Sequence, residues 1–134
     1  MKYMLLMQFA DADADKIPPM SGWKPEEIQA HIAFMNGFCE RLTASGELVE
    51  AQGLDDPSQA RIVQAGPDGA PVVTDGPFPE TKEFVVGYWV VDCETEGRAL
   101  EIAGEASTAP GPGGEPLRMP IQIRRIMAEP PVEP

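Results

Sequence analysis

The chain has 134 residues, 43% hydrophobic and 24% charged, which is typical of one soluble globular domain. Its 10 Lys and Arg residues against 22 Asp and Glu residues give a formal net charge of −12, so we expect no binding to nucleic acid or to anionic membranes. The apolar run at the start is too short for a signal peptide or a membrane span. Cys39 and Cys93 fit no disulfide or metal-binding spacing, which favours free thiols in the cytoplasm.

The first half of the chain predicts one strand, one helix and then three short strands. Residues 2–9 carry apolar side chains at both alternating sets of positions, which indicates a strand that is covered on both faces. Residues 25–45 predict a helix, because Pro25 suits its first position and Gly46 suits the residue after its end. One face of this helix gathers Ile28, Ile32, Phe34, Met35, Phe38, Cys39 and Leu42. Short strands are expected at 47–53, 60–65 and 71–74, the last two pairing with each other.

The second half predicts the central strand of the sheet, a second helix and a final strand. Residues 84–91 are apolar on both faces, with Phe84, Val86, Tyr88 and Val90 on one of them. We expect Asp92 to cap a helix over about 94–107, with Ala99, Leu100, Ala103 and Ala106 facing inward. Residues 109–116 predict a mobile connection, 117–127 the last strand, and 128–134 a disordered Pro-rich tail. We therefore expect a single domain over residues 1–127.

This order of elements predicts an antiparallel sheet with two helices, which the right-handed crossover rule places on one face. Two strands are apolar on both faces, so the uncovered face would expose more apolar surface than a monomer usually tolerates. The pattern therefore favours a symmetric homodimer in which two such faces pack together.

Two side chains are the best candidates for chemistry. His31 is the only histidine, and it falls inside the apolar arc of the first helix; the alternative interpretation is a core histidine with a structural hydrogen bond. Asp75 precedes Gly76 and Pro77, which fix the backbone of the turn, and the alternative is an ordinary turn-forming aspartate. The sequence shows no nucleophile elbow, no phosphate-binding loop and no histidine-rich metal site, so we expect neither a metal nor a cofactor.

The run Thr74-Asp-Gly-Pro-Phe-Pro-Glu80-Thr-Lys82-Glu83 closely resembles the signature of the YCII-related proteins called the DGPF family. The likeness extends to the opening strand, to His31, to Ser45-Gly46-Glu47-Leu48 and to Gly87-Tyr88. The resemblance implies a ferredoxin-like dimeric α+β barrel, with a pocket in which His31 and Asp75 approach each other. We also expect Phe78, Glu80, Lys82 and Arg124 to contact the substrate. The last strand departs from the family's Glu-Val-Arg-Pro-like ending, since it reads Gln122-Ile123-Arg124-Arg125.

These observations favour a small cytoplasmic, cofactor-independent enzyme that acts on a compact organic molecule. His31 would act as general base or acid and Asp75 would orient its ring, which suits lyase or isomerase chemistry. The alternative from another class is a non-catalytic ligand-binding or regulatory dimer, since some similar proteins occur beside extracytoplasmic-function sigma factors. A purely structural dimer is the third interpretation.

Overall fold

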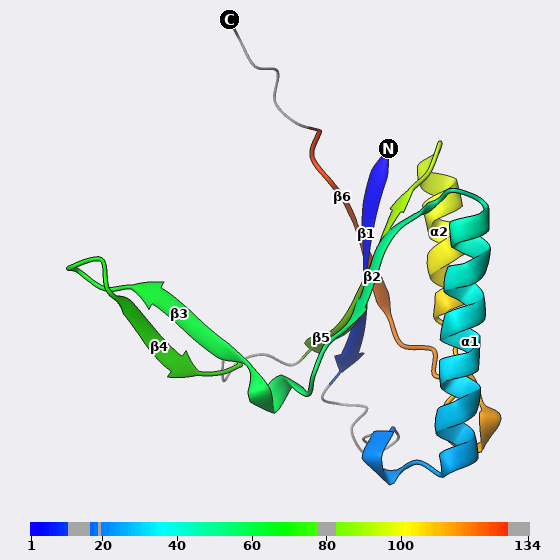
Figure 1. The fold of residues 1–134 in the computed structure, drawn as a ribbon, viewed down its shortest axis with the longest axis horizontal. Coiled ribbons are helices and arrows are strands. Elements are labelled where there is room, and N and C mark those ends of the chain that lie inside the picture. The colour runs from blue at the N-terminus through cyan, green and yellow to red at the C-terminus, as the bar shows by residue number, and fades with distance from the viewer. Residues whose placement is uncertain (11–16, 19, 78–82, 129–134) are drawn as a thin grey trace, which may run out of the picture.

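The computed structural model describes residues 1–10, 17–18, 20–77 and 83–128 and has an α+β fold. Four strands form one antiparallel sheet, two helices cover one of its faces, and a two-stranded hairpin extends from the opposite side (Figure 1). The fold is ferredoxin-like, as the resemblance implies. The strands are β1 (Lys2–Ala10), β2 (Leu48–Gly53), β3 (Arg61–Ala65), β4 (Pro71–Asp75), β5 (Glu83–Asp92) and β6 (Ile121–Arg125), and the helices are α1 (Pro25–Ala44) and α2 (Glu96–Ala106).

The four-stranded sheet has the order β2-β5-β1-β6, so β5 is central, as predicted, and β1 lies beside it. Leu5 pairs with Trp89 on one side and with Ile123 on the other, and all three lie on the face toward the helices. β6 is shorter than the predicted strand. Leu117 and Arg118 instead donate their backbone N–H groups to the carbonyls of Ala109 and Ser107, which commits this stretch to a loop before Pro120.

The core lies between the sheet and the two helices, and its largest fully buried side chains are Phe38, Leu5, Ile102 and Val91. The ring of Phe38 meets that of Trp89 edge to face, with centroids 5.7 Å apart. On both helices fewer apolar side chains are buried than predicted. Ile32 on α1 and Leu100 on α2 were expected to face inward, but they are 49% and 55% exposed.

The helix ends follow local chemistry. Lys24 donates its backbone N–H to the Glu27 carboxylate (2.8 Å) just before α1, and Gly46 adopts a φ of 79° beyond its end. For α2 the predicted cap is wrong: Thr95, not Asp92, accepts the N–H of Arg98. Asp92 is the last residue of β5, and its carboxylate accepts from the terminal ammonium of Met1 at 3.1 Å.

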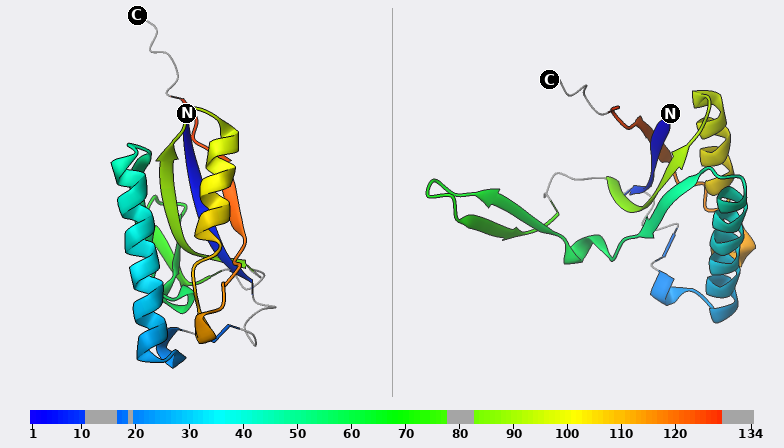
Figure 2. Two further views of the ribbon diagram at one scale, coloured as in Figure 1. Left: turned by 90° about the vertical axis from the view of Figure 1, so that its right-hand side faces the viewer. Right: turned by 45° about the horizontal axis from the view of Figure 1, so that its top comes forward.

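Strands β3 and β4 form a sheet of their own, which we call the arm (residues 61–75). They pair with each other, as predicted, and with no strand of the main sheet. The right-hand view in Figure 2 shows the arm reaching away from the layer of helices. Val63 and Val73 pair across the arm and are 57% and 59% exposed, so the arm carries apolar side chains without a covering layer.

The sheet face that the helices do not cover is called the open face here. Side chains alternate between faces along a strand, so Met4 and Leu6 lie on the open face, together with the residues paired to them. A register shift between Met7 and Gln8 places Val85 opposite Gln8, so Val85, not the predicted Val86, continues this face. The open face comprises Met4, Leu6, Gln8, Glu50, Gln52, Val85, Tyr88, Val90, Gln122 and Arg124.

Candidate functional site

His31 lies in the second turn of α1 and is half-buried. Its Nδ1 is 3.0 Å from the carbonyl oxygen of Pro110, which lies 79 residues further along the chain. The ring of Trp23 meets the imidazole edge to face, with centroids 5.5 Å apart. Two contacts from different segments therefore fix the orientation of the ring.

The loop that carries Pro110 is held firmly against α1. A side chain at Gly111 would lie 2.9 Å from Leu117 Cγ and 3.6 Å from the Trp23 ring, so only glycine fits this close approach. Glu27, one turn before His31, accepts a hydrogen bond from the backbone N–H of Gly113, and this bond lowers the pKa of the Glu27 carboxyl. The sequence predicted a mobile connection at 109–116, and in the structure two side chains of α1 form hydrogen bonds with this loop, so its mobility stays a prediction.

The contact with Pro110 decides which nitrogen of His31 carries a proton. A carbonyl oxygen only accepts, so Nδ1 must be the donor, and in the neutral ring Nε2 keeps its lone pair. When Nε2 takes up a proton, the hydrogen bond from Nδ1 is retained. This is the arrangement that a histidine general base requires.

Asp75 lies at the end of β4, at the base of the arm. Its side chain is 90% exposed and pairs with Arg61, whose Nε lies 3.3 Å from Oδ1. The turn that follows needs its glycine, because a Cβ at Gly76 would lie 2.9 Å from Ile62. His31 and Asp75 thus have different partners in the chain, and no hydrogen bond joins these two described residues. Their pairing stays a prediction.

The other predicted site residues divide into two groups. Phe78, Glu80 and Lys82 lie outside the described residues, so their role stays a prediction. Arg124 is exposed and lies on the open face, whereas His31 belongs to the helix that covers the opposite face. The sheet therefore separates Arg124 from His31 within one chain.

A hollow of about 430 Å³ lies at the base of the arm, where Leu54, Phe84 and Val85 contribute apolar surface and Asp55 and Glu83 contribute carboxylates. It shares no residue with the surroundings of His31. The hollow is wide and open, and within the described part of the chain no group of three His, Cys, Asp or Glu side chains could hold a metal ion.

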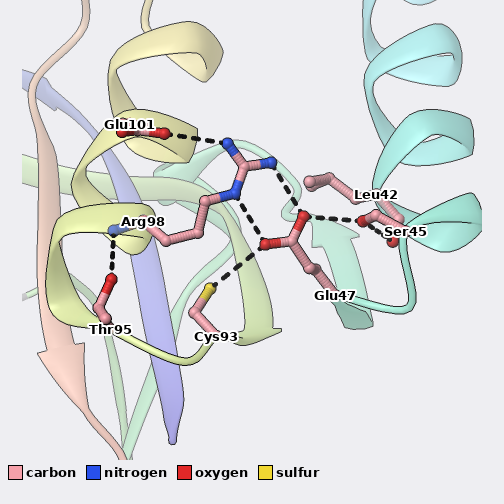
Figure 3. Close-up of polar contacts among 7 residues, drawn as sticks. All are labelled: Leu42, Ser45, Glu47, Cys93, Thr95, Arg98 and Glu101. Carbon is pink, nitrogen blue, oxygen red and sulfur yellow. Dashed lines mark hydrogen bonds and ion pairs between the residues drawn. The ribbon is translucent and has the colours of Figure 1, made fainter.

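The sequence did not predict the ion pair between Glu47 and Arg98, in which the arginine binds the carboxylate with two nitrogens (Figure 3). Arg98 Nε and Nη2 reach the two carboxylate oxygens at 2.8 and 2.9 Å, and Ser45 adds a third bond. Arg98 and then Ser45 lower the pKa of Glu47 to about 2. The pair joins the start of β2 to α2, and burial together with Glu47 raises the pKa of the neighbouring Cys93 thiol. The Ser45-Gly46-Glu47 run after α1 was the only sequence signal for it.

In the described ranges no helix has the length and apolar character that crossing a membrane requires. Residues 1–111 match the YCII-related domain family. The chain is 30% identical over 99 residues to an uncharacterized protein of Rhizobium meliloti (strain 1021), and the match covers 73% of this chain and 79% of that protein. This chain therefore belongs to the YCII-related family.

Proposed function

We propose that the protein is a metal-independent enzyme that moves a proton on a small organic molecule, with Nε2 of His31 as the proton acceptor. The observation that carries this proposal is the 3.0 Å contact between His31 Nδ1 and the carbonyl oxygen of Pro110. It supplies what a general base needs from a supporting residue, namely a fixed ring and a fixed tautomer. Lyase and isomerase reactions that begin by removing a proton from carbon fit this single base.

The carbonyl oxygen of Pro110 supports the ring of His31 in the way that the sequence suggested for Asp75, and a role for Asp75 beside His31 stays part of the proposal. The carbonyl stabilises the imidazolium as an acceptor, although without the full negative charge of a carboxylate. His31 is half-buried, so a small molecule can approach Nε2 from outside the core. The predicted substrate contacts of Phe78, Glu80 and Lys82 belong to the same proposal.

A non-catalytic ligand-binding or regulatory protein is the second candidate, and one observation favours it. His31 and Glu27 anchor the same loop from successive turns of α1, so the contact with Pro110 also serves the structure alone. A link to sigma-factor signalling would belong to this candidate.

We also propose that the protein is a homodimer formed through the open face. Met4, Leu6 and Tyr88 lie in the middle of that face, on the two central strands, and are half-buried, next to the buried Val90. A cytoplasmic location is part of the proposal, supported by the free thiols of Cys39 and Cys93.

Two variants separate catalysis from structure. In His31→Asn the amide nitrogen can still donate to Pro110, but no proton acceptor remains; His31→Ala removes both functions. The purified proteins are incubated in D₂O with a panel of small carbonyl and carboxylate compounds, and exchange of carbon-bound hydrogen for deuterium is followed by mass spectrometry.

We expect the wild type to exchange hydrogen on at least one compound and both variants to lose that exchange, with His31→Asn keeping its thermal stability. Full exchange by His31→Asn would contradict the role of His31. Binding of a panel compound without exchange by the wild type would favour the non-catalytic candidate.

A further inference from the structure

Two side chains of α1 bind one loop from the same side of the helix. Glu27 and His31 are one helical turn apart, so they are neighbours on one face of α1. His31 Nδ1 lies 3.0 Å from the carbonyl oxygen of Pro110, and the Glu27 carboxylate accepts the backbone N–H of Gly113. Both partners belong to residues 109–116, which are called the Pro110 loop here. The loop therefore meets α1 at two points, and only one of them is the candidate base.

The Pro110 loop is closed by hydrogen bonds between its own backbone groups. Gly111 donates its N–H to the carbonyl of Glu115 at 2.8 Å, and Gly114 donates to the carbonyl of Gly111 at 3.0 Å. These bonds hold Pro110 and Gly113 in one tight turn. Because the two residues are joined in this way, we expect a displacement of Gly113 to move the carbonyl oxygen of Pro110 as well.

We infer that Glu27 is a positioning residue for His31: by holding Gly113, it keeps the carbonyl oxygen of Pro110 where Nδ1 of His31 donates to it. The inference rests on the proposed role of His31 as a proton acceptor and adds the residue that fixes its tautomer. Without this bond the carbonyl constrains Nδ1 less, and the neutral imidazole also populates the tautomer with its proton on Nε2. That tautomer has no lone pair on Nε2 and cannot act as a base there.

The electrostatics of Glu27 support this role. The bond from Gly113 is the largest cause of the lowered pKa of the Glu27 carboxyl, ahead of the bond from Lys24, so Glu27 is charged at neutral pH. A charged acceptor binds a backbone N–H more strongly than a neutral acceptor does. Gly113 has a φ of 69°, a left-handed conformation that favours glycine. Glycine is therefore the residue best suited to this point of the loop.

Glu27 also serves the start of α1, and capping alone is the alternative role. Its other carboxylate oxygen accepts the backbone N–H of Lys24 at 2.8 Å. If Glu27 is only a cap, its loss lowers the stability of the chain without changing which nitrogen of His31 carries the proton. The tautomer of His31 thus separates the two roles, whereas thermal stability does not.

The tautomer can be measured directly, because the chain has a single histidine and its imidazole gives one set of nuclear magnetic resonance signals. The ¹⁵N chemical shifts of the ring, recorded at about pH 9 where an imidazole is neutral, give the ratio of the two tautomers. The wild type is compared with Glu27→Ala, Glu27→Gln and Glu26→Gln. Glu26 is the matched control, since it is exposed and lies beside Glu27 in the first turn of α1.

We expect the wild type to carry the proton on Nδ1 and Glu27→Ala to lower the ratio of the Nδ1–H to the Nε2–H tautomer at least about fivefold. Glu27→Gln keeps a weaker, neutral acceptor and should give an intermediate ratio. Glu26→Gln removes the same charge and should leave the ratio unchanged. A ratio that Glu27→Ala leaves at the wild-type value would overturn the inference and leave Glu27 as a cap.

A second pair of variants changes the loop and leaves Glu27 intact. Valine strongly disfavours a positive φ, whereas asparagine tolerates it, so Gly113→Val should lower the ratio and Gly113→Asn should keep it. A Cβ at Gly113 would meet nothing within 4 Å, so the difference between the two variants reports on the backbone and not on a clash. Amide spectra show whether each variant is folded, and the Gly113 pair decides the question if Glu27→Ala is unfolded. An unchanged ratio in Gly113→Val would also overturn the inference.

The tautomer ratio needs no substrate, so its outcome is separate from that of the deuterium-exchange assay. If the ratio falls as expected while the wild type exchanges hydrogen on no compound, Glu27 positions His31 and the proposed function is wrong. If the wild type exchanges hydrogen and the ratio does not change, His31 remains the base and the role of Glu27 is wrong. Where both hold, Glu27→Ala should lower the maximal exchange rate and leave the half-saturating concentration of the compound unchanged.

Discussion

Arg98 donates two hydrogen bonds to the carboxylate of Glu47, and the Glu47 side chain is only 16% exposed. The pKa of Glu47 is about 2 in the folded chain and near 4.5 in the unfolded chain, so folding favours the charged form. The stability that the pair contributes is present above pH 4.5 and is lost as the pH falls toward 2. Because Arg98 is partly exposed, this contribution is on the order of 2 kcal/mol rather than the full value implied by the shift.

We therefore expect Glu47→Gln to lower the free energy of unfolding at pH 7 by about 2 kcal/mol and to flatten its dependence on pH between 4.5 and 2. Urea denaturation at a series of pH values measures both effects. Glu101→Gln is the matched control, because Glu101 contacts the same arginine at 3.2 Å but is 71% exposed, so its loss should cost less than about 0.5 kcal/mol. An acid dependence that is equally steep in Glu47→Gln and in the wild type would contradict this account.

Two glycines lead to opposite expectations. Alanine at Gly111 would press against Leu117 and Trp23, so we expect Gly111→Ala to destabilise the chain by about 1–3 kcal/mol. Gly104 lies inside α2, and a methyl group added there would meet nothing within 4 Å, so Gly104→Ala should stabilise the chain by about 0.5–1 kcal/mol. Thermal unfolding of the two variants beside the wild type decides the signs. A melting temperature of Gly111→Ala equal to that of the wild type would contradict the steric limit at Gly111.

For single residues, the sequence predicts the candidates for a functional role better than it predicts the groups that contact them. The apolar neighbours of His31 at helical spacing predict an inward-facing ring, and the structure places the half-buried ring against Trp23 and Pro110. Its partner could not be predicted, because a backbone carbonyl has no sequence signature and Pro110 is 79 residues away. Asp92 is the last residue of β5, where it pairs with Lys2 and its carboxylate binds the terminal ammonium, so Thr95, directly before α2, caps the helix instead.

Among the elements, the arm is the one whose stability comes mainly from contacts between its own two strands. A two-stranded hairpin alone in water is marginally stable, and the arm relies on cross-strand pairs such as Val63 with Val73 and Arg61 with Asp75. It should therefore open locally without unfolding of the main sheet.

We expect backbone amides in the arm to exchange with solvent deuterium at least about a hundredfold faster than those of β5 that pair with β1, because only the latter require global opening. Native-state hydrogen exchange resolved by peptide or by residue measures the difference. Protection in the arm equal to that in β5 would show that the arm packs against a further surface, such as a second copy.

Periodicity was sufficient to predict most of these elements within a few residues, including the central position of β5. It predicted the pairing of β3 with β4 but not their separation from the main sheet, since hairpin residues pair in the same way in either place. The β6 strand was predicted too long because Leu117 alternates correctly with Met119, while its backbone bonds to Ala109. The exposure of Ile32 likewise depends on how α1 lies over the sheet.

At the scale of the whole molecule, the net charge determines how strongly two copies repel each other. Two chains of charge −12 with centres about 25 Å apart repel each other by on the order of 10 kcal/mol at about 10 mM salt and by about 1 kcal/mol at about 150 mM salt. A few surface ion pairs, each contributing about 0–1 kcal/mol, cannot offset the larger value.

The proposed dimer should therefore tighten when salt is added, with a dissociation constant at least about tenfold lower at about 150 mM than at about 10 mM. Sedimentation equilibrium of the wild type at the two salt concentrations measures this change. Weaker association at higher salt would mean that local ion pairs dominate over the overall charge.

The two tryptophans lie in separate surroundings: Trp89 against Phe38 in the core, and Trp23 against the imidazole of His31. Their fluorescence therefore reports on two places in the molecule: Trp23 on the surroundings of His31 and Trp89 on the core. A ligand that arrives beside His31 changes the emission of Trp23 and leaves that of Trp89 unaltered, whereas denaturation shifts both to longer wavelength. In a Trp23→Phe variant only Trp89 in the core emits. Fluorescence titration with candidate compounds can therefore distinguish binding beside His31 from unfolding before any substrate is identified.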